Sequence, residues 1–203
     1  MNTKDQIKSA ALNLFNKKGI RNVTLREVAD HLERSYGNIT YHFKNKGLLI
    51  TAIYLGMLEE LEAIGVAIRQ DNSSLLTSLL KAPQFTFDLS LKYLFLYVDF
   101  VEIYRSYPDL AQLINQQNEK RKKIWLKTLQ QLQKEQLLRP DLDDSDLDYL
   151  MELSGAMRTY FFLKLSTDIL TASSLKSNYV QSVNQLLKPY LTKAGLKVYQ
   201  SLE

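Results

Sequence analysis

Apolar residues return every three or four positions along most of this chain, which has 203 residues but only 7 glycines and 4 prolines. That spacing puts apolar side chains on one face of a helix, and the scarcity of glycine and proline favours long helices. The pattern starts near the N-terminus, where one apolar stripe consists of Ile7, Ala10, Ala11, Leu14 and Phe15. We therefore predict an all-α fold without strands.

Signals for helix ends divide the first 50 residues into three short helices and the start of a fourth. Gly19 can end the first helix, and Thr24 with Glu27 forms a capping box at the start of the second. Ser35 and Asn45 can cap the third and fourth helices. The second and third helices are separated by a short turn, which is the spacing of a helix-turn-helix.

The sequence predicts a helix-turn-helix domain over residues 1–47 and a helical domain over residues 48–203. In the second domain we expect a short helix that ends before Pro83, one aromatic helix from Phe85 to Tyr107, and a kink at Pro189. The other long helices are expected over about residues 45–69, 109–138, 146–165 and 175–202.

Basic residues are concentrated near the N-terminus. Residues 1–50 contain nine basic and four acidic residues, a net charge of +5, whereas the other 153 residues contain 17 and 18, a net charge of −1. A basic head on a neutral body is typical of a protein that binds nucleic acid. A solvated basic face explains the charge alone equally well.

Composition narrows the remaining classes of function. Without cysteine the chain has no disulfide, no cysteine-bound zinc and no thiol chemistry, which fits a cytoplasmic protein. No run of about 18 apolar residues exists, so we expect no membrane-spanning helix and no membrane partner. The acidic run from Asp141 to Asp148 lacks the glycine and the terminal glutamate of a calcium loop, so we expect it to cap a helix. We expect no metal site and no cofactor.

Several residues of the second and third helices have the chemistry of a DNA reader. Gly37 is costly in a free helix but lets a backbone approach DNA closely, and Asn38 can hydrogen-bond the edge of adenine. Tyr36 can touch a thymine methyl group or a phosphate. The full set of expected DNA-binding residues is Thr24, Arg26, Ser35, Tyr36, Gly37, Asn38, Tyr41, His42 and Lys46.

The run TLREVADHL, the stretch SYGNITYHFKNK and the two leucines that follow it resemble the DNA-binding head of TetR-family bacterial transcriptional regulators. The resemblance covers about residues 4–55. It implies that Arg26 and Asn38 read bases and that Thr24, Tyr41, His42 and Lys46 contact phosphates. The chain departs from the family at Glu33-Arg34, where Gly-Val is usual, and at Thr40, where a phosphate-contacting tyrosine is usual.

The resemblance also implies a homodimer, a repressor role and a C-terminal domain that binds a small molecule. An aromatic stripe at helical spacing fits either a ligand pocket or a plain core. Asp99 has apolar sequence neighbours and needs a partner, which we expect to be Lys92, Arg105, Arg158 or a cationic ligand. The expected effector-binding residues are Tyr93, Leu96, Asp99, Phe100, Ile103 and Tyr160.

We expect the dimer to form through the last two long helices, although packing within one chain explains the same apolar spacing. The stripes in question are Leu147, Leu150, Met151, Ser154 and Met157 on one helix, and Val180, Val183, Leu187 and Leu191 on the other.

The leading hypothesis is a dimeric DNA-binding repressor of a palindromic operator, controlled by a small hydrophobic molecule. A first alternative is an architectural DNA-binding protein that senses no effector. An all-α enzyme is a weaker alternative, because both histidines lie in the head and the chain has no cysteine, no glycine-rich phosphate loop and no cluster with metal-ligand spacing.

Overall fold

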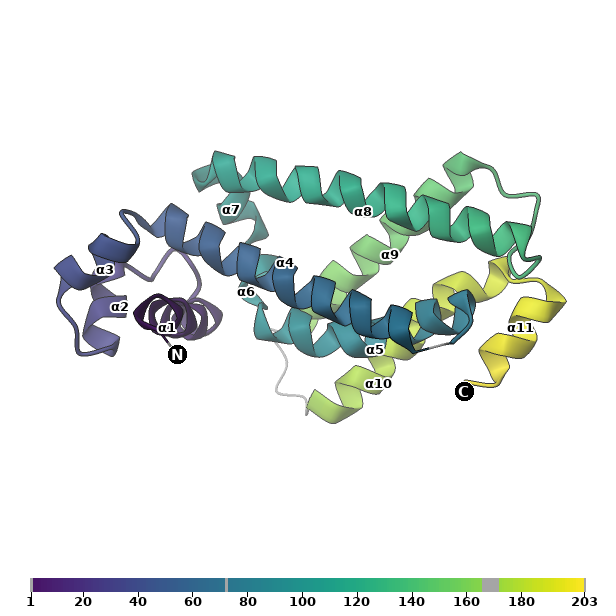
Figure 1. The fold of residues 1–203 in the computed structure, drawn as a ribbon, viewed down its shortest axis with the longest axis horizontal. Helices are drawn as coiled ribbons and strands as arrows, with labels where there is room; N and C mark the ends of the chain where they lie inside the picture. Colours follow the sequence, from purple (N-terminus) through teal and green to yellow (C-terminus); the bar gives the residue numbers. More distant parts are fainter. Residues whose placement is uncertain (1, 72, 166–171, 203) are drawn as a thin grey trace. The chain divides into compact units, whose positions relative to one another are not determined.

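The computed structural model describes residues 2–71, 73–165 and 172–202, and every regular element in those ranges is helical, which confirms the all-α prediction (Figure 1). The helices are α1 (Thr3–Lys18), α2 (Leu25–His31), α3 (Tyr36–His42), α4 (Lys46–Gln70), α5 (Leu75–Lys92), α6 (Phe95–Val98), α7 (Phe100–Ser106), α8 (Pro108–Lys134), α9 (Asp144–Leu165), α10 (Ala172–Leu187), the 3₁₀ helix η1 (Lys188–Tyr190) and α11 (Lys193–Gln200).

The chain forms two compact units. The first consists of Met1–Glu62 and Leu91–Ile114, and the second consists of Ala63–Ser90 and Asn115–Glu203. The first unit therefore contains the three N-terminal helices together with α6 and α7. The expected end of the helix-turn-helix domain at residue 47 remains a prediction.

Helix α1 is the platform of the first unit. It buries the apolar stripe expected from the sequence, and Ile7, Ala11 and Phe15 are at most 1% exposed. The helix ends at Gly19, whose φ of 78° lies in the left-handed region that favours glycine. The N–H of Gly19 donates to the carbonyl oxygen of Phe15 at 2.8 Å. Helix α2 packs against α1, and α3 packs against α2 (Figure 1).

The aromatic segment expected as one helix from Phe85 to Tyr107 is divided among α5, α6 and α7. The first break follows Lys92, and Asn16 of α1 binds the backbone on both sides of it. The Nδ2 of Asn16 donates to the carbonyl oxygen of Lys92 at 2.8 Å, and the N–H of Phe95 donates to the Oδ1 of Asn16 at 2.9 Å. The single-helix prediction is wrong because a side chain distant in sequence supplies hydrogen bonds that a continuous helix would have made itself.

Helix α5 continues through Pro83, so the predicted end before this proline is wrong. Pro83 is buried on the same helix as Leu76, Leu80 and Phe87, at spacings that place all four on one face. Burying a large apolar side chain contributes about 1.5–3 kcal/mol, so this face offsets the roughly 3 kcal/mol that an interior proline costs.

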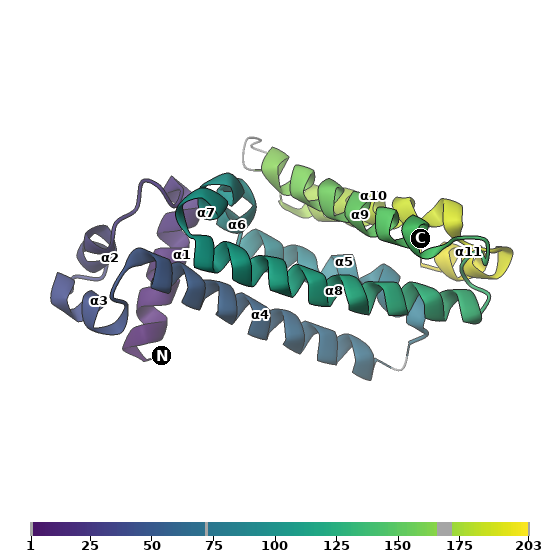
Figure 2. The ribbon, with the colours of Figure 1, turned by 90° about the horizontal axis from the view of Figure 1, so that it is seen from above.

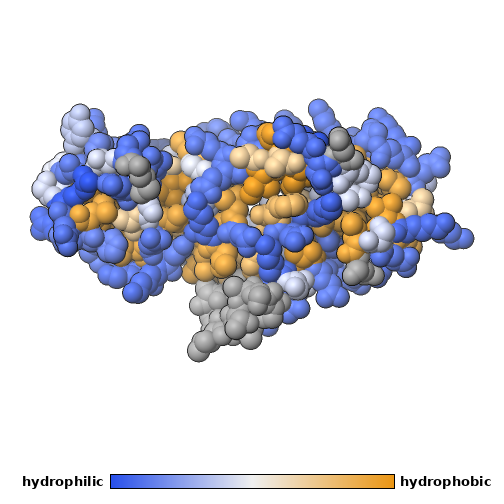
Figure 3. Space-filling view, turned by 60° about the horizontal axis from the view of Figure 1, so that its bottom comes forward, coloured by the Kyte–Doolittle hydropathy of each residue, from blue (hydrophilic) through white to orange (hydrophobic). Residues whose placement is uncertain are grey.

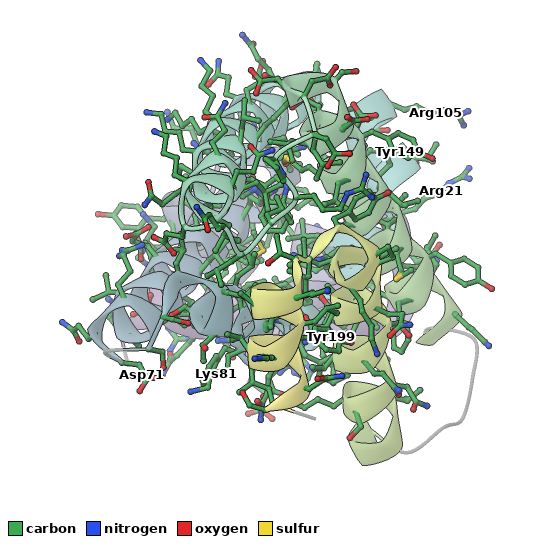
Figure 4. The ribbon with its side chains drawn as sticks, turned by 90° about the vertical axis from the view of Figure 1, so that its right-hand side faces the viewer. Arg21, Asp71, Lys81, Arg105, Tyr149 and Tyr199 are labelled. Carbon is green, nitrogen blue, oxygen red and sulfur yellow. The ribbon has the colours of Figure 1, made fainter. Side chains whose placement is uncertain are left out.

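A cluster of leucines forms the core of the second unit. Its buried members come from α5, α8, α9, α10 and the connections that follow α8 and η1, with Tyr199 added by α11. Figure 4 shows Tyr199 among these helices, and also Asp71 and Lys81, which form an ion pair of 3.1 Å. The helix expected to kink at Pro189 is interrupted there by η1, as predicted. The buried cluster members are Leu76, Leu80, Leu129, Leu132, Leu138, Leu147, Leu150, Leu187, Leu191 and Tyr199.

The acidic run before α9 caps this helix, as predicted. The N–H groups of Ser145 and Asp146 donate to the Oδ1 of Asp143 at 2.8 and 3.0 Å. In the parts of the chain that the structure describes, no group of three potential metal-ligating side chains lies together. Over the same parts, no helix is both long and apolar enough to cross a membrane.

Helix α9 has one buried and one exposed apolar face. The expected dimer stripe is mostly core of the single chain, because Leu147, Leu150 and Ser154 are at most 7% exposed. The same holds for Val183, Leu187 and Leu191, which are also buried. The other face of α9 exposes Tyr149 (61%), Leu153 (36%), Tyr160 (65%) and Leu163 (40%).

The assignment of those buried residues to a dimer surface is therefore corrected. Helices α9 and α10 lie side by side (Figure 2), so their facing sides bury each other within one chain. Hydrophobic residues also reach the surface among hydrophilic ones on the face shown in Figure 3. The exposed apolar residues of α9 are better placed for contact with a second chain.

The Asn16 junction makes a prediction about stability. Asn16→Ala leaves the carbonyl of Lys92 and the N–H of Phe95 without their partner, so we expect a loss of about 1–3 kcal/mol in the free energy of unfolding. Asn13→Ala, the same exchange at an exposed site on α1, is the matched control and should change stability little. Urea unfolding of both variants measures the difference, and equal stabilities would refute the role of Asn16.

Candidate nucleic-acid interface

The start of α2 is fixed by the capping box that the sequence predicts. The N–H of Glu27 donates to the Oγ1 of Thr24 at 3.2 Å, and the N–H of Thr24 donates to the Oε2 of Glu27 at 2.9 Å. Lys18 lies 3.2 Å from Glu27. The hydrogen bond from the Thr24 backbone, and then the Lys18 ammonium, lower the pKa of the Glu27 carboxyl. Thr24 itself is exposed, so a partner can reach it.

The turn between α2 and α3 departs from the family pattern without losing its shape. Glu33 has a φ of 54°, the left-handed conformation in which a glycine would be unstrained. Arg34 does not fill the core with an aliphatic side chain. Its Nη2 instead donates to the Oε1 of Gln6 at 2.7 Å, which ties the turn to α1.

Helix α3 buries one face and exposes the other. Ile39 and Phe43 are buried, at 0% and 3% exposed, and the N–H of Asn38 donates to the Oγ of Ser35 at 3.2 Å, which caps the helix. Tyr36 and Tyr41 stay outside, 47% and 83% exposed. Since a helix buried on one side is fixed in rotation, these two side chains have a defined direction.

A hollow of about 580 Å³ lies where α2, α3 and the turn into α4 meet. The guanidinium carbon of Arg26 is 5.6 Å from the centre of the Tyr36 ring, an arrangement that preorients both side chains. Lys44 and Asn45 belong to the lining but are absent from the expected DNA-binding set. The lining consists of Thr24, Leu25, Arg26, Tyr36, Lys44, Asn45 and Lys46.

Lys44 could have been found from the sequence, because it is a cation that directly precedes the predicted start of α4. Asn45 caps that helix, as predicted: the N–H of Leu48 donates to the Oδ1 of Asn45 at 2.9 Å. A hollow lined by two lysines, an arginine and hydroxyl groups suits a phosphate, which accepts hydrogen bonds from all of them.

Lys46 has a structural role that the sequence does not show. Its Nζ donates to the carbonyl oxygens of Ile20 and Val23 at 2.8 and 2.9 Å. Burial lowers the pKa of this ammonium. Two of its three N–H groups are therefore engaged within the protein, and the predicted phosphate contact can use only the third.

The remaining residues of α3 differ in whether their polar atoms are free to hydrogen-bond DNA. Asn38 is half-buried, and its Oδ1 is shielded from solvent without a hydrogen-bond partner in the described residues. The hydroxyl of Thr40 donates to the carbonyl oxygens of Tyr36 and Gly37 at 3.2 and 3.3 Å. The hydroxyl hydrogen of Thr40 is thus used within α3. His42 packs edge-to-face with Tyr41.

The expected effector-binding residues do not all lie in one unit. Tyr160 is on α9 of the second unit, where it is 65% exposed. In the first unit Ile103 is fully buried, Leu96 is half-buried and Phe100 is 45% exposed. Tyr93 is buried, and its hydroxyl donates to the Oε1 of Glu60 at 2.8 Å.

Asp99 finds a partner that the sequence does not reveal. The N–H of Ile20, just after α1, donates to the Oδ2 of Asp99 at 2.7 Å. The expected cationic partners are therefore replaced by a backbone group. Burial raises the pKa of the Asp99 carboxyl, while the Ile20 N–H and the nearby Lys46 act in the opposite direction. Because Lys46 binds the carbonyl of the same residue, Ile20 is held on both sides.

Two family models match this chain. Residues 7–53 match the model described as "Bacterial regulatory proteins, tetR family", and residues 57–199 match the model described as "Bacterial transcriptional repressor". Over 66 residues the chain is 36% identical to the "Probable HTH-type transcriptional regulator YttP" of Bacillus subtilis. That match covers 30% of this chain and 32% of the relative.

Solved structures have the same fold over nearly the whole chain. A TetR-family transcriptional regulator from Marinobacter aquaeolei has a TM-score of 0.82 and 26% identity, covering 98% of this chain and 97% of its own. The ketosteroid transcriptional regulator KstR2 of Mycobacterium tuberculosis has a TM-score of 0.72 and 21% identity, covering 95% and 96%. At 21% identity, the likeness to KstR2 shows a shared fold alone.

Gly37 allows a test of the interface. A methyl group added there would meet only the Oγ of Ser35, at 3.9 Å, so the free protein has room for alanine. Gly37→Ala should raise the free energy of unfolding by about 0.5–1 kcal/mol and yet weaken DNA binding, because the methyl group occupies the space of an approaching base or phosphate.

Gly56→Ala in α4 is the matched control, since a methyl group there meets nothing within 4 Å. It should stabilise the protein similarly without changing DNA affinity. Thermal unfolding and fluorescence anisotropy with labelled DNA measure both effects. Undiminished DNA affinity in Gly37→Ala would show that DNA does not approach α3 at this position.

Proposed function

Because the chain belongs to the TetR family of bacterial regulatory proteins, we propose that it represses transcription by binding a palindromic operator as a homodimer, and that a small molecule releases it from DNA. Membership makes the chain a DNA-binding transcriptional regulator rather than an enzyme. We infer that it acts in the cytoplasm, where bacterial DNA lies. The repressor role is supported by the description of the model that matches residues 57–199.

The observation that carries the proposal is the exposed side of α2 and α3. Ile39 and Phe43 fix α3 from within, so Tyr36 and Tyr41 face outward. The Tyr36 ring lies beside Arg26. A recognition helix laid in the major groove needs such a rigid, polar outer face. The basic hollow beside it supports contacts to the flanking phosphates.

The homodimer is supported by the exposed apolar face of α9. Tyr149, Leu153, Tyr160 and Leu163 lie on one side of this helix and are at least 36% exposed. Exposed aromatic and aliphatic residues gathered on one face mark interaction surfaces. Two copies related by a twofold axis would present two recognition helices to half-sites about 34–36 Å apart, which is why we expect a palindromic operator.

Control by an effector is supported by the way α6 and α7 are joined to the head within the first unit. Asp99, between α6 and α7, holds the N–H of Ile20, and Asn16 holds the backbone around Lys92 and Phe95. A ligand that shifts α6 or α7 would therefore displace the end of α1 and the loop that leads into α2. The free energy of DNA binding can then change by at most the difference between the ligand's binding free energies for the two arrangements.

An architectural DNA-binding protein without an effector remains the second candidate, and it is favoured by how tightly Tyr93 and Ile103 are packed. Thermal-shift measurements separate the two candidates. A ligand that binds only the native state raises the melting temperature, and it should also lower operator affinity if the regulator proposal holds.

The DNA-binding proposal makes a residue-specific prediction. Arg26→Ala should weaken binding to the operator by roughly 5- to 150-fold, equivalent to about 1–3 kcal/mol, and relax the preference at one base position. Arg105→Ala, which removes an exposed arginine from α7 of the same unit, is the matched control and should leave affinity within about twofold.

The operator can be sought by mobility shift with DNA fragments that flank the protein's own gene, followed by anisotropy titrations at a fixed salt concentration. Binding to a sequence with twofold symmetry is expected. Failure to shift any fragment at low salt would overturn the proposal, and equal losses in the two arginine variants would overturn the assignment of Arg26.

A further inference from the structure

An arginine interrupts the buried ridge of α9. Leu150, Ser154, Arg158 and Phe162 follow one another at intervals of four residues, so their side chains lie on one face of the helix. Leu150, Ser154 and Phe162 are 2%, 7% and 0% exposed. Arg158 is half-buried between them, and its Nε is shielded from solvent.

Arg158 points away from the surface proposed for the dimer. At about 100° per residue, it lies roughly 180° around the helix from Tyr149. Tyr149 and Tyr160, at 61% and 65%, mark the exposed side. A second chain that packs on that side would therefore not reach the Arg158 guanidinium.

The guanidinium has no ion-pair partner within the described residues, and its Nε has no hydrogen-bond acceptor there. Two other cations of the second unit have close ion-pair partners: Lys122 lies 2.8 Å from Asp148, and Lys176 lies 2.6 Å from Asp88. The indole N–H of Trp125, also in the second unit, is likewise buried without an acceptor in the described part of the chain.

Both unsatisfied groups can only donate hydrogen bonds, so the partner they lack is an acceptor. A charge removed from water is costly unless an opposite charge compensates it, and the planar fork of arginine fits a carboxylate or a phosphate. Phe162 is one turn beyond Arg158, and its ring packs against those of Phe87 and Tyr179 at centroid distances of 5.8 and 5.3 Å. A cation therefore lies one helical turn from a cluster of aromatic rings.

We propose that Arg158 binds the acidic group of the effector, which is an amphipathic anion: an apolar molecule bearing a carboxylate or a phosphate. This inference rests on the proposed function, because it presumes an effector. It narrows the expected hydrophobic molecule to one with a negatively charged end.

A ligand series on the full-length protein tests the charge requirement. The probes are decanoate, decyl phosphate and the uncharged methyl decanoate, matched in chain length and followed by the melting temperature and by fluorescence of Trp125, the single tryptophan. At least one anion should bind about tenfold or more tightly than the ester. The better anion identifies carboxylate or phosphate as the preferred group. Equal or stronger binding of the ester overturns the inference.

Substitution of Arg158 distinguishes a binding residue from a structural one. Arg158→Met removes an uncompensated charge, so the ligand-free protein should melt about 2–4 °C higher while its affinity for the anion falls about tenfold or more. Arg158→Lys keeps the charge but loses the fork, and it should bind the anion with intermediate affinity. A lower melting temperature in Arg158→Met with unchanged anion affinity would assign Arg158 to the structure alone.

Arg105→Gln is the matched control, because Arg105 is exposed and extends into solvent (Figure 4), and it should alter neither property. Operator binding of the ligand-free variants separates this inference from the proposed function. If the operator is bound but Arg158→Met leaves anion binding unchanged, the inference fails alone. If the wild-type protein binds no operator, the proposed function fails.

Discussion

Ile20, the residue that follows the end of α1, is held from both sides, and the head depends on this clamp. The carboxylate of Asp99 accepts its N–H at 2.7 Å, and the ammonium of Lys46 donates to its carbonyl oxygen at 2.8 Å. These two charged groups come from the α6–α7 junction and from the first residue of α4. Hydrogen bonds to charged groups contribute about 1.5–3 kcal/mol each, roughly twice as much as neutral ones. The position of the loop into α2 is therefore set by residues outside α2 and α3.

The clamp joins the loop that leads into α2 to the α6–α7 junction and to the start of α4 within the first unit. Lys46 has the charge of a phosphate contact, but two of its N–H groups bind backbone carbonyl oxygens within the protein. Burial raises the pKa of Asp99 and lowers that of Lys46, and the attraction between these two opposite charges acts against both shifts.

Local signals in the sequence are enough to predict where the helices of the head begin. The Thr24–Glu27 box and the Asn45 cap involve residues three positions apart, so pattern alone predicts them. Contacts between distant residues lie beyond such patterns: Asn16 divides the aromatic segment, and Asp99 turns to the backbone rather than to an arginine. Periodicity predicts the apolar stripe of α9 but not what covers it, so the sequence alone leaves a dimer surface and a single-chain core as alternatives. For the same reason the sequence suggests Arg158 only as a partner of Asp99, and does not predict that its Nε is shielded from solvent on the buried side of α9.

The operator affinity of two Asp99 variants tests the clamp most directly. Asp99→Asn keeps an oxygen that can accept the Ile20 N–H, whereas Asp99→Ala leaves that N–H without its partner. The clamp predicts that Asp99→Ala binds the operator about tenfold more weakly than Asp99→Asn, because about 1.4 kcal/mol of positioning energy is lost. Equal operator affinities in the two variants, measured by anisotropy at one salt concentration, would contradict it.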